Sequence, residues 1–292
     1  MADITQHTAT VNGVEFAYLS AGRDGPLALC LHGFPDTAHT WRMLLGRLSA
    51  EGFRAVAPFQ RGFAPTAVPA DGRYQTGALA LDANAFHESL GGDAQAVVIG
   101  HDWGAPAAYG AAVHEPDRWH KVIGMAVPPG AAMGAAFLGN LTQVQRSWYM
   151  FFFQHPLADL VVAANDMAFL DMLWSQWSPG YAADNDLRAV KDALRDPANM
   201  TAALGYYRAA LGTGYQDPQL AAIQDSVSSG LPTQPTLYLH GADDGCIGAE
   251  VAESARAMVT DNVAIEVIGG AGHFLHLEQP VAVNDRIVEF LQ

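Results

Sequence analysis

The chain has 292 residues, half of them hydrophobic, and a formal net charge of −15 at pH 7. This length allows one large domain with an insertion or two small domains, and the apolar content supplies a substantial core. The negative field would repel nucleic acid and anionic membranes, so we expect neither as a partner. Small neutral or cationic ligands remain open.

The two cysteines, Cys30 and Cys246, form no disulfide framework and lack metal-ligand spacing, which favours a reducing compartment. The amino terminus shows no charged segment followed by an apolar one, and no apolar run is long enough to span a bilayer. We therefore expect a cytoplasmic protein. The oligomeric state is not readable from the sequence, and a homo-oligomer stays open.

The chain begins with a β-hairpin signal, because Asn12-Gly13 stands between alternating residues over 8–19. Short apolar strands and helix-like stretches then alternate. The strands are expected at 27–31, 54–57, 96–99 and 121–127, and the helices between the earlier ones at 41–48 and 77–90. This alternation predicts an α/β fold with a mostly parallel sheet covered by helices on both faces.

The alternation stops after Pro128-Pro129-Gly130. From there to about Pro232 the sequence is helix-like and rich in aromatic residues, and strands are expected again at 235–240 and 263–268. A helical insertion between two strands of one sheet explains this pattern, and it would lie over the carboxyl ends of the strands, where ligands bind in such folds. The predicted division is a core of residues 1–129 and 226–292 and a helical cap of residues 130–225.

The stretch VVIGHDWG, residues 97–104, reads as a strand, a sharp turn and the start of a helix. Gly100-x-Asp102-x-Gly104 has the spacing of a nucleophile elbow, with aspartate in the place of serine. The alternative is an ordinary strand-to-helix turn in which the aspartate caps the helix.

Other loops that follow predicted strands also carry candidate reactive groups. They contain His32-Gly33-Phe34-Pro35, Asp243-Asp244 and Gly272-His273. With the elbow, they give the chain order nucleophile, acid, histidine that is typical of α/β-hydrolases. The joint occurrence predicts Asp102 as nucleophile, His273 as base and Asp244 as the orienting acid, with Asp243 as the fallback.

An aspartate nucleophile indicates the kind of bond that is broken. Serine attacking a saturated carbon would leave an ether that water cannot release, whereas a carboxylate gives an alkyl ester whose carbonyl belongs to the enzyme. Asp102 therefore predicts a saturated-carbon electrophile and an ester intermediate, which water activated by His273 would hydrolyse.

The ester hydrolysis requires donors for an oxyanion, and backbone N–H groups are the usual ones. The amides of Trp103 and Phe34 are expected in this role, and both side chains are expected to line the pocket. We assign His32 to the same oxyanion and substrate pocket, where it and His101 would hold the loops in place. His276 is expected to be structural.

The chain resembles the α/β-hydrolase superfamily over nearly its whole length, and its motifs resemble those of the epoxide hydrolases. These motifs are His32-Gly33-Phe34-Pro35, Gly100-His101-Asp102-Trp103-Gly104-Ala105 and Gly272-His273-Phe274. Tyr149, in YMFFFQHP, and Tyr207, in GYYRAAL, are similar to the two cap tyrosines of that family, with Tyr206 as the alternative to Tyr207. The resemblance implies hydrolysis of an epoxide to a vicinal diol, without metal, flavin or nicotinamide.

Tyrosine hydroxyls suit an epoxide, because ring opening produces an alkoxide that needs a proton donor. The alternatives are a haloalkane or haloacid dehalogenase and a non-catalytic ligand-binding relative. Haloalkane dehalogenases usually have a side-chain donor where Phe34 stands, and fluoroacetate dehalogenases favour an arginine where Trp103 stands. A ligand-binding relative would be expected to have lost part of the triad.

The substrate itself is not readable from the sequence. Apolar side chains in the insertion favour an aryl or alkyl epoxide; they are Met150, Phe151, Phe152, Phe153, Trp174 and Trp177. One loop departs from the family pattern, because residues 62–66 read Gly-Phe-Ala-Pro-Thr where the family often has Gly-x-Gly-x-Ser. That departure bears on the shape of the pocket.

Overall fold

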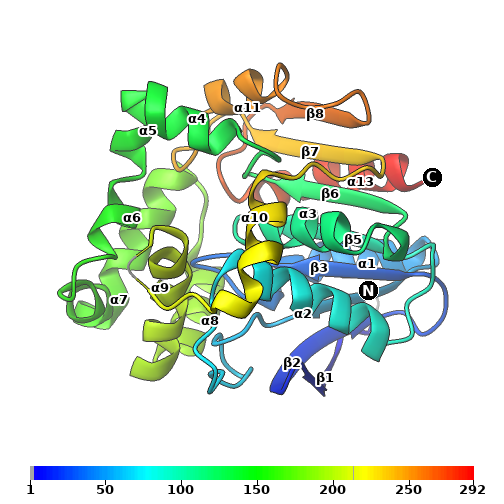
Figure 1. Ribbon diagram of the computed structural model, residues 1–292, viewed down its shortest axis with the longest axis horizontal. Coiled ribbons are helices and arrows are strands. Elements are labelled where there is room, and N and C mark those ends of the chain that lie inside the picture. The colour runs from blue at the N-terminus through cyan, green and yellow to red at the C-terminus, as the bar shows by residue number, and fades with distance from the viewer. Residues whose placement is uncertain (1–2, 213) are drawn as a thin grey trace.

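The computed structural model describes residues 3–212 and 214–292 (Figure 1). Eight strands form one sheet in the order β1-β2-β4-β3-β5-β6-β7-β8. Their bounds are Thr5–Val11, Val14–Ala21, Leu27–Leu31, Arg54–Pro58, Val97–His101, Lys121–Met125, Thr236–Gly241 and Val263–Ile268, for β1 to β8. The first two strands are antiparallel to their neighbours, and all pairs from β4 to β8 are parallel, as the alternation predicts.

The hairpin between β1 and β2 turns at the expected position. Asn12 has a φ of +48° and Gly13 a φ of +75°, which are the left-handed conformations that a two-residue hairpin turn requires. The sixth strand is shorter than the sequence predicts. It ends at Met125, because Ala126 has a φ of +65° and leaves the extended conformation.

The inner strands are buried on both faces. In β3, Leu27, Leu29 and Leu31 pack into one apolar layer, while Ala28 and Cys30 pack into the other. Successive side chains of a strand point to opposite faces, so a strand buried on both sides reads as a continuous apolar run. This explains why the inner strands were visible in the sequence without alternation.

Helices cover both faces of the sheet (Figure 1). One layer holds α1 and α13, whose leucine, valine and isoleucine side chains share a cluster with the sheet, and the other holds α2, α3, α10 and α11. These helices span Arg42–Ala50 for α1, Thr76–Ser89 for α2, Gly104–His114 for α3, Ala221–Ser229 for α10, Ala249–Ala255 for α11 and Pro280–Leu291 for α13. The short helix α12 spans Leu275–Glu278.

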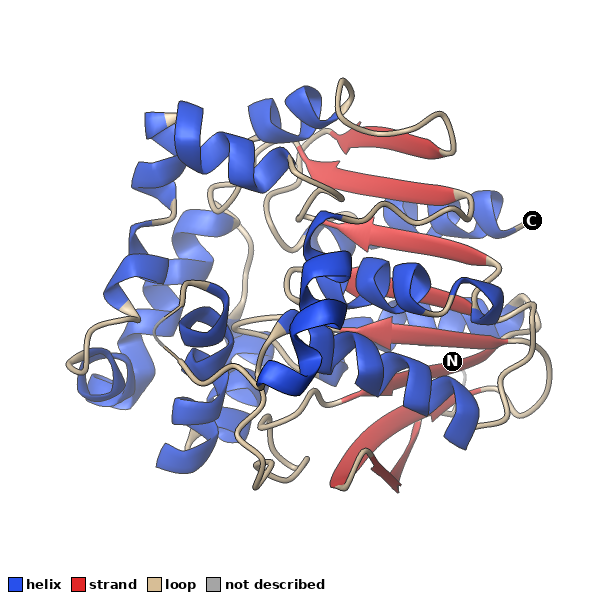
Figure 2. Ribbon diagram, in the orientation of Figure 1, coloured by secondary structure: helices blue, strands red, loops and turns tan. Residues whose placement is uncertain are grey.

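The segment between β6 and β7 is helical in its described part, as expected, and its helices lie beyond the carboxyl ends of the strands (Figure 2). They are Ala132–Gly139 for α4, Leu141–Arg146 for α5, Trp148–Phe152 for α6, Ala158–Trp177 for α7, Asp184–Leu194 for α8 and Pro197–Ala210 for α9. None of the helices in the described ranges is long and apolar enough to cross a membrane.

The last helix of this segment, α10, differs from the helices before it, because it packs on the helices that cover the sheet. The Gln224 side chain accepts a hydrogen bond of 2.8 Å from the Gly77 amide at the start of α2, and a Cβ on Gly110 in α3 would lie 2.9 Å from Val227. Residue 225, the expected end of the cap, therefore falls inside a helix that packs on α2 and α3. The division into core and cap stays a prediction.

Helix α7 is interrupted near its middle. Asn165, Asp166 and Met167 have φ values of +52°, +51° and +58°, so two helical segments meet at a sharp bend. Left-handed conformations are unfavourable for residues with a Cβ, and three in succession are rare. Asp166 forms an exposed ion pair of 3.1 Å with Arg195, the residue that follows α8.

The loop that departs from the family pattern is anchored to both the core and α9. Arg61 makes a two-pronged ion pair with Asp82 of α2, with N–O distances of 2.6 and 2.7 Å, and both side chains are buried. The carbonyl oxygens of Arg61 and Gly62 accept hydrogen bonds from Tyr206 and Asn199 of α9. This loop therefore connects the cap helices to the sheet.

Replacing Arg61 with methionine should destabilise the fold strongly, because Asp82 would become a buried carboxylate without its cation. Removal of one partner of a buried ion pair costs about 3 to 5 kcal/mol. We expect the free energy of unfolding, measured by urea denaturation, to fall by that amount. The control is Arg47→Gln on the surface, which should change it far less. Equal small effects of both substitutions would contradict the assigned role of the pair.

Candidate active site

The elbow after β5 places Asp102 in a strained conformation at the start of α3. Asp102 has a φ of +51°, and its amide donates to the Met125 carbonyl over 3.2 Å. A Cβ on Gly100 would lie 2.0 Å from the Gly104 carbonyl oxygen, and one on Gly104 would lie 1.9 Å from that of Leu31. Glycine is therefore required at both positions, which is the physical meaning of the motif.

The two oxygens of Asp102 face different groups. Oδ1 accepts a hydrogen bond of 2.7 Å from the Phe34 amide, and Oδ2 lies 3.5 Å from Nε2 of His273. The loop after β3 approaches this closely because Gly33 has no side chain: a Cβ there would lie 2.2 Å from Oδ1 and 2.5 Å from the Trp103 amide nitrogen. One oxygen is thus fixed at a backbone donor and the other faces the histidine.

The structure brings His273 and Asp244 together, and Asp243 stays apart. Nδ1 of His273 lies 2.9 Å from Oδ2 of Asp244, whose Oδ1 accepts from the amides of Cys246 and Ile247 over 2.7 and 2.9 Å. Asp243 is exposed to solvent. The carboxylate that orients the histidine is therefore held by two backbone donors, which a surface aspartate would lack.

The contacts of His273 with two carboxylates favour its protonated form. Burial by itself lowers its pKa, but the charge of Asp244 and the hydrogen bonds to Asp102 and Asp244 outweigh burial and raise it to about 10. The same pairing holds the pKa of Asp244 below its usual value, although burial opposes this. The two carboxylates on one ring therefore favour the imidazolium form of His273 as long as Asp102 is charged.

The two cap tyrosines face the carboxylate with their rings 5.6 Å apart, and both are buried. Burial raises the pKa of Tyr149 and of Tyr207 well above the usual value, which keeps both phenols protonated as donors. The Tyr149 hydroxyl contacts Sγ of Cys246 at 3.3 Å. The Tyr207 hydroxyl has no well-formed hydrogen bond, whereas that of Tyr206 donates to the Arg61 carbonyl over 2.9 Å. Tyr207 thus has the available hydroxyl.

A cavity of about 370 Å³ reaches Asp102. Its lining contains Asp102, Trp103, Tyr149, Met150 and Tyr207, and further side chains that are apolar or small: Thr76, Pro106, Tyr109, Val127, Pro128, Gly130, Met133, Gly134, Phe137, Ser147, Ala210, Leu211, Val227, Ser228, Gly230 and Ile247. Asp102 is the one charged side chain in this lining. The cavity is therefore suited to an uncharged, apolar ligand.

Several residues expected at the pocket lie behind it. His32 accepts from the Gln60 amide over 2.9 Å and its other ring nitrogen lies 2.8 Å from the Gly33 carbonyl, so it holds the loop and does not line the cavity. The Phe34 ring is fully buried against Tyr207. Expected lining residues of the cap fall outside as well: Phe151 is exposed to solvent, Phe152 is partly buried, and Phe153, Trp174 and Trp177 are buried in the cap packing.

Behind His273 lies a buried group in which Asp36, which the sequence analysis missed, joins His101 and His276, which were expected to have structural roles. Nε2 of His101 lies 2.9 Å from the His273 carbonyl, so it donates there, and Nδ1 faces Oδ2 of Asp36 at 3.8 Å. Asp36, His101 and His276 form one of two groups in the described chain with the composition of a metal site; the other is Asp244, Cys246 and His273. Burial raises the pKa of Asp36 and lowers that of His101 to about 3, so burial disfavours the charged form of both groups. We assign the group to support of the His273 backbone.

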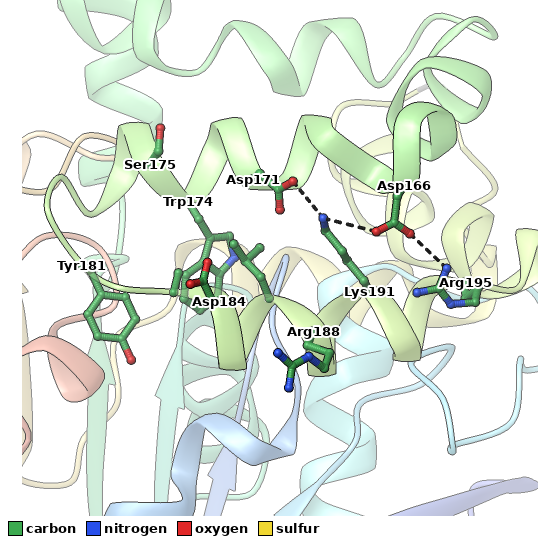
Figure 3. Close-up of a pocket in the computed structure, with 11 residues that line it drawn as sticks. Asp166, Asp171, Trp174, Ser175, Tyr181, Asp184, Arg188, Lys191 and Arg195 are labelled. Carbon is green, nitrogen blue, oxygen red and sulfur yellow. Dashed lines mark hydrogen bonds and ion pairs between the residues drawn. The ribbon is translucent and has the colours of Figure 1, made fainter.

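A larger hollow, of about 610 Å³, lies between α7 and α8 on the outer side of the cap (Figure 3). Four of its charged side chains pair with each other: Lys191 contacts Asp171 at 2.8 Å, and Asp166 contacts Arg195. Its lining contains none of the triad residues and neither cap tyrosine. The size of this hollow therefore gives no reason to move the active site away from Asp102.

The fold and the site together define a hydrolase of the α/β type. A parallel sheet carries the acidic elbow after β5, the orienting acid after β7 and the histidine after β8, and helices inserted after β6 supply two phenols. This is the chain order of nucleophile, acid and histidine in such enzymes.

Comparison with known proteins agrees with this class. The sequence profile of the α/β hydrolase fold family matches residues 26–280. Epoxide hydrolase 4 of Homo sapiens is 30% identical over 296 residues, which cover 96% of this chain and 76% of that protein. An epoxide hydrolase of Caballeronia sordidicola is 27% identical over 322 residues, covering 99% and 94%.

Among solved structures, the epoxide hydrolase of Bacillus megaterium in complex with an inhibitor is similar with a TM-score of 0.82. It is 26% identical in sequence, and the match covers 98% of this chain and 99% of that one. The chain belongs to the α/β-hydrolase fold family, and within it to the epoxide hydrolases.

The raised pKa of His273 predicts a pH-dependent stability. Because the folded value, about 10, lies above the unfolded value of about 6.5, the stabilisation is fully present below about pH 6.5 and is lost as pH rises through about 10. Asp102→Asn removes one of the two carboxylates, so NMR titration should show a lower pKa for His273 than in the wild type. The melting temperature of this variant should also fall less than that of the wild type between about pH 7 and about pH 10.

Asp243→Asn is the matched control for this measurement, because Asp243 is exposed and does not contact the ring. It should leave both the His273 titration and the pH profile of the melting temperature as in the wild type. An unchanged His273 titration in Asp102→Asn would show that Asp102 does not hold the imidazolium.

Proposed function

We propose that this protein is an epoxide hydrolase that converts an epoxide and water to a vicinal diol through an ester on Asp102. The observation that carries the proposal is the environment of that carboxylate. One oxygen is bound by the Phe34 amide, the other faces His273, and the phenols of Tyr149 and Tyr207 face the same cavity. The similarity to named epoxide hydrolases supports it.

In the first step, Oδ2 of Asp102 attacks a ring carbon of the epoxide and forms a C–O bond. The bond from that carbon to the epoxide oxygen breaks, and its electron pair stays on the oxygen. The oxygen takes a proton from Tyr149 or Tyr207, whose raised pKa values mean that both phenols enter the step protonated. The product is a hydroxyalkyl ester of Asp102.

Ester formation prepares His273 for the second step. The ester has no charge, so one of the two carboxylates that raise the pKa of His273 disappears. The imidazolium then gives up its proton and the tyrosinate left by ring opening takes one up, so the phenol is restored with no net change in protons. His273 becomes a neutral base, still oriented by Asp244 through Nδ1.

In the second step, water attacks the ester carbonyl and gives a proton to Nε2 of His273. The oxyanion that develops on Oδ1 is stabilised by the Phe34 amide, which already donates to this oxygen. The bond from the carbonyl carbon to Oδ2 breaks, and the diol leaves with the proton from His273. The acid formed on Asp102 passes its proton to His273, which restores the resting ion pair.

A dehalogenase is the second candidate, and one observation bears on it. The indole Nε1 of Trp103 is buried without a well-formed hydrogen bond and could solvate a halide. Phe34 supplies no second side-chain donor, whereas two phenols are present. A paired assay with styrene oxide and a bromoalkane distinguishes the two: bromide release without diol formation would favour the dehalogenase.

His273→Gln should trap the ester, because the first step needs no base and the second does. We expect mass spectrometry of the variant treated with styrene oxide to show a substrate-mass adduct on the peptide that contains Asp102. Asp102→Asn should give no adduct. Turnover by His273→Gln without an adduct would rule out the two-step scheme.

Tyr149→Phe and Tyr207→Phe should each slow ring opening, by about 10-fold to 100-fold for the loss of one donor. Tyr206→Phe is the matched control, because its hydroxyl is already bonded to the Arg61 carbonyl outside the cavity. Stopped-flow measurement of ester formation in a His273→Gln background separates this step from hydrolysis. A larger effect of Tyr206→Phe would reverse the assignment of the donor.

A cytoplasmic location and a homo-oligomer stay predictions. Both cysteines are free and buried, which accords with the reducing compartment expected from their spacing.

A further inference from the structure

The active-site cavity extends to only one side of Asp102. Besides the site residues themselves, its lining comes from α4 and the loop before it, from α6, from the end of α9, from α2, α3 and α10 on the core side, and from Ile247 in the loop after β7. The opposite side of the carboxylate, toward the loop after β3 and the end of α7, contributes no lining residue. The described chain fills that side with aromatic rings.

Phe34 and Phe153 form the nearer part of this filling. Both side chains are fully buried, and their ring centroids lie 5.6 Å apart. Each ring also packs edge-on against Tyr207, at 5.3 Å for Phe34 and 5.0 Å for Phe153. Both rings are therefore in direct contact with Tyr207, one of the two proposed proton donors.

Trp174 and Trp177 close the same side further along. Trp177 packs on the ring of His273 at 5.1 Å and on Tyr149 at 5.0 Å, and its carbonyl accepts the His273 amide over 3.0 Å. Trp174 stacks on Phe274 with centroids 3.6 Å apart. Its indole N–H donates to the Pro35 carbonyl over 2.9 Å. The indole bond fixes the Trp174 ring, and the Trp177 ring is held by packing, so moving either aside would disturb a packed interior.

Because the cavity lies on one side, the geometry of an epoxide limits where its ring can carry substituents. The attacked carbon must face Oδ2 of Asp102 while the ring oxygen faces Tyr149 and Tyr207. With these two atoms placed, the second ring carbon lies beside the attacked one, and substituents on the two ring carbons point away from each other. A cavity on one side accommodates the substituents of one carbon only.

We infer that this protein acts on terminal epoxides, in which one ring carbon bears the whole apolar substituent and the other is an unsubstituted CH₂ facing Phe34, Phe153 and Trp177. This inference rests on the proposed function and specifies its substrate class. The open side, about 370 Å³ with no charged side chain besides Asp102, is large enough for an aryl group. Phe153 is the specificity-determining residue with the most direct effect, because it borders Tyr149 and Tyr207 without bonding to the carboxylate.

The test compares two isomeric substrates, with styrene oxide as the reference. α-Methylstyrene oxide carries its methyl on the same carbon as the phenyl ring, and trans-β-methylstyrene oxide carries it on the other carbon. We expect the wild type to prefer the α-isomer by at least about 100-fold in kcat/KM, or about 2.7 kcal/mol. The two isomers have the same atoms, so a preference reports the position of the substituent.

Phe153→Ala should raise the ratio of β-isomer to α-isomer kcat/KM by at least about 10-fold, because it opens space on the closed side. Phe152→Ala is the matched control, since this neighbour is only partly buried and does not line the closed side. Circular dichroism melts show whether each variant is folded. If Phe153→Ala fails to fold, equal kcat/KM values for the two isomers in the wild type would still overturn the inference without any variant.

The outcomes separate this inference from the proposed function. Diol from styrene oxide with equal kcat/KM for both isomers would overturn the terminal-epoxide inference and leave the epoxide hydrolase intact. Absence of diol from all three epoxides would instead remove the proposed function. A strong preference for the α-isomer that Phe153→Ala relaxes, and Phe152→Ala does not, supports the inference.

Discussion

The chemistry of this site depends on one contact, the Asp102 carboxylate held between the Phe34 amide and His273. The contact is possible because the backbone of two loops can approach the elbow. At Gly33 and Gly104 an added Cβ would lie 2.2 Å or less from the carboxylate or from a carbonyl oxygen. Glycine in these motifs thus provides the space in which a charged side chain meets its donor.

The charge around His273 differs between the two proposed half-reactions. At rest, two carboxylates share one buried imidazolium, and the pKa of His273 is raised accordingly. Forming the ester removes one negative charge and makes the ring a base at the moment when water must be activated. The nucleophile therefore controls the histidine, as well as depending on it, and no additional group is needed to switch the site from alkylation to hydrolysis.

The cap contributes shape as well as proton donors. Rings from α7, from the end of α6 and from the loop after β3 fill one side of Asp102, while α4, α9 and α10 leave the other side open. Tyr149 and Tyr207, the proposed donors to the epoxide oxygen, also pack against the rings of the closed side. Reactivity and substrate shape are consequently coupled, because a change in this aromatic packing acts on both the donors and the space for the substrate.

The sequence by itself determined the alternating architecture, the elbow and the candidates Asp102, Asp244 and His273, because strand periodicity and glycine spacing are local properties of the chain. It left Tyr206 and Tyr207 as alternatives and gave no sign of Asp36, and it placed Phe34 and Trp177 in the pocket lining. Those questions depend on which surfaces meet between segments more than 100 residues apart, as when Tyr206 reaches the Arg61 carbonyl. Only tertiary packing fixes burial, the partner of each hydroxyl and the charge that each neighbour imposes, so only the structure decided the protonation of His273 and the open side of the cavity.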